Sequence, residues 1–155
     1  MTTKMTQAAT QTKYTEERER VVNDAPRLHP VFEPGDVCHQ GDLIFVALGS
    51  LPKTAVRRNN RQLAEGSTPG SRHILTRGDL YDADPAEVAG LIRKANKVEV
   101  DPRYIGPVFV SPDAPTADDL THPEHGNQGW PAGTICAVVY QRNLDAEQRE
   151  ARVRD

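Results

Sequence analysis

Three histidines carry the clearest chemistry in this sequence. His122 and His125 stand three positions apart in a loop shaped by Pro123 and Gly126, and His73 lies beside a strand-like run elsewhere in the chain. A loop restricted by proline and glycine can hold two imidazole rings so that they converge on one point. Zinc, iron and nickel accept imidazole nitrogen at about 2.0–2.2 Å, and three protein ligands leave a position open for water or substrate. The sequence therefore predicts a divalent-metal site with these three histidines as its ligands.

Four further residues are candidates for the surroundings of this site. Glu124 lies between the two loop histidines and could act as a carboxylate ligand or as a general base. Cys136 could replace a histidine on a softer metal, and Gln141 and Arg142, at a strand end, could line a pocket. A purely structural role stays open, in which each histidine makes an ordinary hydrogen bond at a strand end. No spacing here matches the H-E-x-x-H zinc motif, so the sequence names no catalytic residue.

A group of arginines offers a second type of site. Its members are Arg57, Arg58, Arg61, Arg72 and Arg77. Together they could contact phosphate groups. However, 22 acidic residues outnumber 19 basic ones, and the aromatic residues that would stack on bases make up only 5% of the chain. A solvated loop is therefore favoured over a nucleic-acid-binding surface.

Composition excludes several other classes of protein. The formal net charge of -3 is too small to steer the chain toward nucleic acid or a membrane surface. No run approaches the roughly 18 apolar residues of a membrane span, and residues 1–13 lack the apolar centre of a signal peptide. Two cysteines, Cys38 and Cys136, make no disulfide framework. We therefore expect a cytoplasmic protein.

The elements that must position these residues are mostly short strands. Apolar runs between glycines and prolines predict them at 37–40, 43–48, 63–66, 72–76, 98–100, 104–110 and 134–141. The last run is apolar on both faces, which is typical of a central strand. One helix is predicted over 85–95, with Asp84 as its N-cap and an apolar face of helical spacing. This order predicts a mainly β, α+β fold: a compact antiparallel barrel or sandwich with one amphipathic helix.

The chain divides into four parts. Residues 1–14 lack apolar periodicity and are predicted to be a disordered tail. Residues 15–30 are predicted to contain a short charged helix, at 15–24, and a proline-rich connection. The β-rich domain spans 31–144, and residues 145–155 are predicted to contain a short charged helix. Neither terminal helix has the apolar content to bury much surface within a monomer.

Several short motifs resemble a family of small uncharacterised bacterial and phage proteins. The family pattern runs roughly L-A-E-G-E-x-T-G-H-x-H, then H-x-E-H, a P-x-G turn and a strand that ends in Q-R. The matching segments here are 63–73, 122–125, 131–133 and 141–142, within a resemblance that covers most of residues 35–155. The family supplies neither a substrate nor a reaction. Ser71 stands where the pattern has its first H-x-H histidine, which weakens any site that needs both.

The same motifs also resemble the cupin double-stranded barrel. In cupins, histidines on neighbouring strands hold a divalent metal, and Cys136 stands where a later cupin histidine is expected. This is a likeness at the level of the fold, and it implies a scaffold for a metal and no particular activity.

Two functions from different classes follow. The first is a small soluble metal- or ligand-binding β module of unknown activity, built around the three histidines. The second is a non-catalytic accessory, structural or interaction protein of the phage or mobile-element type, which acts through its termini and loops. Such a protein would dock on a protein partner or form a homo-oligomer. The histidines favour the first function, and the two charged terminal helices favour the second.

Overall fold

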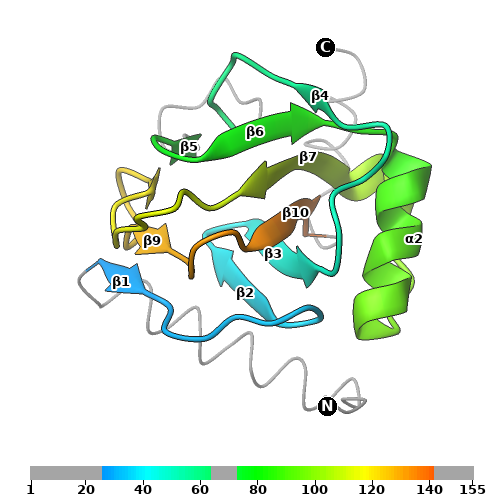
Figure 1. Ribbon diagram of the computed structural model, residues 1–155, viewed down its shortest axis with the longest axis horizontal. Helices are drawn as coiled ribbons and strands as arrows, with labels where there is room; N and C mark the ends of the chain where they lie inside the picture. The colour runs from blue at the N-terminus through cyan, green and yellow to red at the C-terminus, as the bar shows by residue number, and fades with distance from the viewer. Residues whose placement is uncertain (1–25, 64–72, 142–155) are drawn as a thin grey trace.

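A six-stranded antiparallel sheet forms the centre of the fold (Figure 1). The computed structural model describes residues 26–63 and 73–141 of the chain. In spatial order the strands are β2 (Val37–Gln40), β3 (Leu43–Leu48), β10 (Ile135–Tyr140), β7 (Ile105–Val110), β6 (Asp79–Asp82) and β4 (Val56–Arg57). The predicted central strand is confirmed, because β10 pairs with β3 along one side and with β7 along the other.

A smaller sheet of four strands lies against the large one. Its order is β1 (Arg27–Leu28), β9 (Gln128–Gly129), β8 (Leu120–Thr121) and β5 (Ile74–Leu75). Strand β1 runs parallel to β9, whereas the β9–β8 and β8–β5 pairs are antiparallel. The strand predicted at 72–76 is present as the two-residue β5, and its partner β8 comes from a distant part of the chain.

The α-helix of the described residues, α2 (Pro85–Asn96), lies beside the large sheet (Figure 1). Asp84 is its N-cap, with a carboxylate that accepts a hydrogen bond from a backbone N–H of the first turn, and Pro85 fits at the start because it needs no donor there. Val88 and Ile92 are fully buried, and Lys97 ends the helix in a left-handed conformation at φ 67°. The predicted helix and its cap are confirmed.

The alternation of side chains along β10 divides the interior into two apolar clusters. Ala137 and Val139 point toward α2 and pack in the cluster that contains Val88. Cys136 and Val138 point to the opposite face and pack in the cluster between the two sheets. One strand therefore supplies both cores, which explains why its sequence is apolar without alternation.

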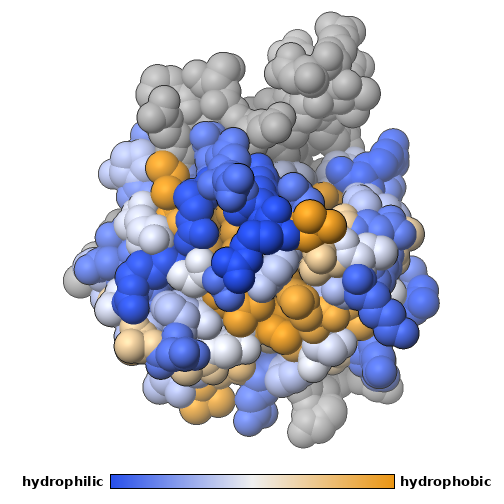
Figure 2. Space-filling view, turned by 45° about the horizontal axis from the view of Figure 1, so that its top comes forward, coloured by the Kyte–Doolittle hydropathy of each residue, from blue (hydrophilic) through white to orange (hydrophobic). Residues whose placement is uncertain are grey.

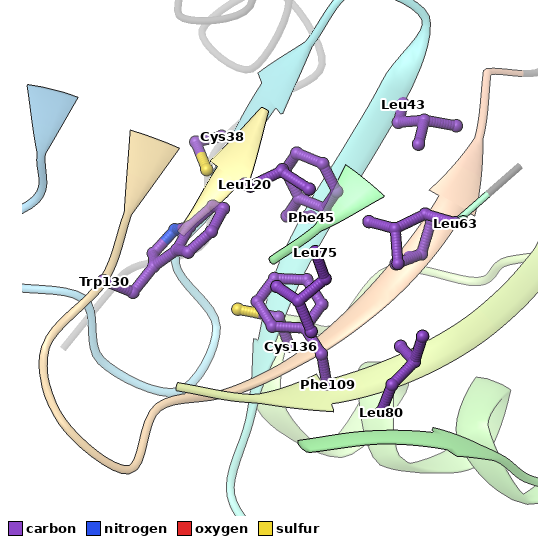
Figure 3. Close-up of a cluster of buried hydrophobic side chains, with 11 residues drawn as sticks. Cys38, Leu43, Phe45, Leu63, Leu75, Leu80, Phe109, Leu120, Trp130 and Cys136 are labelled. Atoms are coloured by element: carbon purple, nitrogen blue, oxygen red, sulfur yellow. The ribbon is translucent and has the colours of Figure 1, made fainter. Parts of the chain in front are cut away.

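Trp130 anchors the cluster between the two sheets (Figure 3). The indole is fully buried, with its ring centroid 5.5 Å from that of Phe45 and 5.0 Å from that of Phe109. It also stacks on the ring of His29, with the two ring centroids 5.6 Å apart. Aromatic pairs at these distances add to the burial of apolar surface, by about 0.5–1.5 kcal/mol each. The smaller sheet is thereby fixed to the larger one.

The large sheet does not close into a barrel. Strands β2 and β4 stand at opposite ends of the strand order and are not paired with each other, so the expected barrel is wrong and the sandwich-like α+β alternative is correct. Residues 98–100, predicted as a strand from composition, form none. They link α2 to the 3-10 helix η2 (Pro102–Tyr104), where no neighbouring strand pairs with them. Tertiary context thus overrides their β propensity.

Some predictions fall on parts of the chain that are not described. These are the tail at 1–14, the charged helices at 15–24 and 145–154, and residues 64–66 of the strand expected at 63–66. Gln62, just before that strand, makes an isolated bridge to Ile74. Within residues 26–63 and 73–141, no helix is long and apolar enough to cross a membrane.

Candidate functional site

The pairing of β5 with β8 brings two of the predicted histidines together. His73 directly precedes β5 and His122 directly follows β8. Because Ile74 is paired with Thr121 in antiparallel register, the two histidines occupy the next cross-strand position. Their ring centroids are 4.3 Å apart, and the ring of His125 lies 4.6 Å from that of His122. The structure thus gathers all three imidazoles, although the second lies 49 positions after the first in the sequence.

The turn between β2 and β3 lies against these rings. Gly41 and Asp42 form a two-residue hairpin turn, in which Gly41 has a positive φ of 58°. A Cβ atom at Gly41 would lie 2.8 Å from Cδ2 and 2.9 Å from Nε2 of His125, and 3.3 Å from Cε1 of His73. Only glycine leaves room for this approach of backbone to imidazole.

The side chain of Gln40 hydrogen-bonds with Nδ1 of His73. The Gln40 side chain is fully buried, and its Nε2 donates to the Gly126 carbonyl at 2.9 Å and, more weakly, to the Leu120 carbonyl at 3.5 Å. Since the amide nitrogen must face these acceptors, Oε1 faces Nδ1 of His73 at 2.9 Å. An amide oxygen can only accept, so Nδ1 of His73 is the donor.

The other nitrogen of His73 faces a carboxylate. Nε2 lies 3.2 Å from Oδ1 of Asp42. A neutral imidazole with its proton on Nδ1 presents a lone pair at Nε2, and a lone pair next to a carboxylate oxygen is unfavourable. A proton or a metal cation between the two atoms relieves that repulsion. His73 is buried, whereas the side chain of Asp42 is 39% exposed, so solvent reaches the pair through Asp42.

His122 has a different hydrogen-bonding pattern. Its Nδ1 accepts hydrogen bonds from the backbone N–H groups of Glu124, at 3.0 Å, and His125, at 3.2 Å. This is the pattern by which asparagine and aspartate side chains form local turns. With Nδ1 occupied as an acceptor, the proton of the neutral ring is on Nε2, and neither nitrogen offers a lone pair to a metal in this arrangement. His122 therefore shapes the loop that carries His125.

The other predicted residues lie in unlike environments. Glu124 is exposed, and its backbone N–H rather than its carboxylate makes the contact with His122. Cys136 is fully buried in the apolar cluster between the sheets, where burial raises the pKa of its thiol well above the ordinary value (Figure 3). Gln141 is close to the histidines, because its Nε2 donates to the Gly41 carbonyl at 3.3 Å. Arg142 lies outside the described residues.

The described histidines, cysteines and acidic residues do not form a complete metal centre. Across residues 26–63 and 73–141, no group of three or more such side chains is arranged to hold a metal ion. His73 and Asp42 present two donor atoms facing each other, and His125, whose ring contacts the turn that carries Asp42, is a candidate for a third. Any ion bound here would complete its coordination with a rotated His125 ring, with water or with a ligand.

The arginines of the predicted basic group are engaged within the fold. Arg57 pairs with Asp79 at 3.0 Å, and Arg61 donates to two backbone carbonyls. Arg58 and Arg77 also contact carboxylates; Arg72 is not among the described residues. Figure 2 shows one face of the molecule, on which hydrophilic side chains surround a central apolar area. These contacts support the interpretation of a solvated surface rather than a phosphate-binding one.

The sequence does not single out Gln40, Gly41 or Asp42 as site residues. Gln40 ends the strand predicted at 37–40, and Gly41 and Asp42 fall between it and the strand predicted at 43–48. One signal was present: Gln40 is a polar residue between two apolar strand segments, and such a residue needs a hydrogen-bonding partner when it is buried. That partner is His73, whose proximity depends on the unpredicted contact between the two sheets.

A comparison with protein families places this site within a recognised domain. Residues 39–141 match the model of a domain of unknown function, DUF8820. No curated protein and no solved structure matches the chain at a significant level. The match agrees with the expectation of an uncharacterised family, while the particular motif pattern and the cupin likeness are not confirmed by it. The matched range includes the β2–β3 turn and all three histidines, and the chain belongs to the DUF8820 domain family.

Proposed function

We propose that this domain is a small metal-binding β module whose ion sits between His73 and Asp42. One observation carries the proposal: Nε2 of a buried His73, with Nδ1 already donating to Gln40, lies 3.2 Å from a carboxylate oxygen. A divalent cation inserted there would replace an unfavourable contact with two bonds to the protein. Imidazole nitrogen with carboxylate oxygen suits zinc, iron or nickel.

His125 is the candidate third ligand. Its Nε2 and Cδ2 lie on the side of the ring that contacts the Gly41 turn, the same turn that carries Asp42. A modest rotation of the ring, which stands on a loop rather than a strand, would direct Nε2 toward the ion. Two or three protein ligands leave open positions for water or a small ligand. The proposal assigns no reaction to them.

The proposal is tested by metal content and metal affinity. Purified protein is analysed for zinc, iron and nickel, and zinc binding is then titrated calorimetrically. We expect His73→Ala and Asp42→Asn to lose the ion, whereas Asp79→Asn, which removes an exposed carboxylate paired with Arg57, keeps it. Metal-free wild-type protein that binds zinc no more tightly than these variants would refute the proposal.

The role of His122 is tested separately with His122→Asn. The asparagine oxygen can accept the two backbone hydrogen bonds that Nδ1 of His122 accepts. If His122 shapes the loop without binding metal, this variant retains the ion, in contrast to His73→Ala. Loss of the ion in a folded His122→Asn protein would make His122 a ligand, as the sequence alone suggested.

A second candidate function is that of an accessory or interaction protein, and one observation favours it. A hollow of about 320 Å³ lies at the end of the β3–β10 pair, lined by Phe32, Leu48, Pro131 and Ile135 among others. Val31, next to this lining in sequence, is 65% exposed. The hollow and the exposed valine beside it offer a surface on which a protein partner or a second copy could dock. A defined oligomer of metal-free protein in light scattering would favour this function over the first.

A further inference from the structure

Gln40 is a polar residue of the protein interior. It stands at the end of β2, is fully buried, and bonds with both of its side-chain polar atoms. A buried amide costs free energy unless each atom finds a partner. The amide meets this requirement by joining two polar groups, the Gly126 carbonyl and Nδ1 of the buried His73, which would lose these hydrogen bonds if a hydrophobic side chain stood at this position.

We infer that Gln40 is a positioning residue that fixes the proton of His73 on Nδ1 and so reserves Nε2 for a ligand. The Gly126 carbonyl orients the amide by accepting from its Nε2 at 2.9 Å, and the oriented Oε1 accepts from His73 Nδ1 at 2.9 Å. The placement of a proton on one ring nitrogen by a neighbouring acceptor is how metal-binding histidines are oriented in general. The inference about metal affinity rests on the proposed function; the inference about the proton does not.

Asp42 competes with Gln40 for the same ring. In an isolated imidazole either nitrogen can carry the proton, and Oδ1 of Asp42, 3.2 Å from Nε2, favours a proton on Nε2. If the amide oxygen were absent, the neutral ring would place its proton on Nε2 and donate it to Asp42. An ion would then have to displace that proton before it could bind. Gln40 prevents this arrangement.

The orienting contact also joins distant parts of the chain. The Gly126 carbonyl belongs to the loop that carries His125, so the amide of Gln40 connects β2, the histidine loop and His73. The hydrogen bond to Gly126 thus holds the amide in the orientation in which Oε1 faces His73.

Nitrogen-15 NMR of the histidine rings in metal-free protein tests the inference at a fixed, mildly alkaline pH. We expect Nδ1 of His73 to be protonated in the wild type. In Gln40→Leu, which removes both polar atoms, we expect Nδ1 to lose its proton to Nε2. In Gln40→Glu, which keeps an oxygen acceptor, we expect Nδ1 to stay protonated. An unprotonated Nδ1 in the wild type, or a protonated one in folded Gln40→Leu, would overturn the inference.

Metal titration adds a readout that separates this inference from the proposed function. We expect Gln40→Leu to weaken zinc binding about 10–100-fold, the usual effect of removing a residue that orients a ligand. If the wild type binds no metal but shows the Nδ1 proton and its loss in Gln40→Leu, the proposed function fails and the positioning role stands. If zinc binds to the wild type but Nδ1 of His73 is unprotonated, the proposed function stands and the positioning role of Gln40 fails. Should Gln40→Leu not fold, the spectra of the wild type and of Gln40→Glu still test whether Nδ1 of His73 is protonated next to an oxygen acceptor at position 40.

Discussion

Replacement of Gly41 by alanine is the most direct test of the site geometry. The new Cβ would lie 2.8 Å from Cδ2 and 2.9 Å from Nε2 of His125, so the ring must move by about 0.6 Å to reach the 3.4 Å of ordinary contact. His73 Cε1, at 3.3 Å, is crowded much less. His125 is the end of a side chain on a loop and can rotate. We therefore expect the rings to separate while the sheet keeps its structure.

The expected loss of unfolding free energy in Gly41→Ala has two parts, and a control substitution at Gly133 separates them. Gly41 has φ 58°, and an alanine in the left-handed region costs about 1–2 kcal/mol. Gly133 has φ 75° and open space where its Cβ would lie, so Gly133→Ala reports this backbone cost alone. Displacement of a packed ring adds about 1–2 kcal/mol, as overpacking does elsewhere. We expect urea denaturation to show a loss of about 1–2 kcal/mol in Gly133→Ala and about 2–4 kcal/mol in Gly41→Ala.

The NMR resonances of the histidine rings distinguish the two variants more clearly than their stabilities do. In Gly41→Ala we expect the histidine resonances of His125 and His73 to shift and zinc affinity to fall, whereas Gly133→Ala leaves both unchanged. Equal stability losses in the two variants, together with unmoved ring resonances, would show that the turn does not touch the imidazoles. The reasoning about the site would then be refuted, whatever metal the protein binds.

Three further predictions concern the scaffold. Gly129→Ala should lower the free energy of unfolding, measured by urea denaturation, by at least about 3 kcal/mol, because its Cβ would lie 1.8 Å from a backbone carbonyl oxygen that cannot move away without a shift of the main chain. A loss of less than about 1 kcal/mol would contradict this close approach. Cys38 and Cys136 should react with a disulfide reagent at pH 8 only as fast as the protein unfolds. Burial raises the pKa of the Cys38 thiol to about 12 and that of the Cys136 thiol well above its ordinary value, so neither forms the reactive thiolate in the folded protein. Rapid labelling of the folded protein would contradict this prediction. Hydrogen bonds from the 53–54 loop, above all from the Thr54 hydroxyl, lower the pKa of Glu87 below 4.5. The wild type should therefore be more stable than Glu87→Gln by the full amount above pH 4.5, and this difference in unfolding free energy should disappear as the pH falls through the lowered pKa. An advantage that is unchanged in acid would rule out this contribution.

The sequence predicts the local elements better than their assembly. The helix at 85–95 follows from Asp84, Pro85 and an apolar face, all of which act within the helix itself, and the structure confirms it. The central position of β10 follows from its apolar residues on both faces. Closure into a barrel depends on how the two edges meet, and no local pattern encodes that. The choice between a barrel and a sandwich, and the assignment of each strand to one of the two sheets, are therefore visible only in the structure.

The candidate site shows the same limit. Histidine content and loop composition point to His73, His122 and His125, and the three rings do lie together. Their roles, however, depend on which atoms surround each ring nitrogen. Two backbone N–H groups occupy Nδ1 of His122, and a glutamine from another sheet occupies Nδ1 of His73. Spacing in the sequence carries no information about such partners, so it could not distinguish a candidate ligand from a turn-forming residue.

The place of β10 in the large sheet has a consequence for biosynthesis. Among the described strands it is the last to leave the ribosome, yet it occupies the middle of the sheet between β3 and β7. Until it emerges, the β2–β3 hairpin and the β6–β7 pair are separate halves, each with an unpaired edge that can associate with other nascent chains. Completion of the large sheet therefore waits for β10, and chaperones that shield strand edges should raise the yield of folded domain.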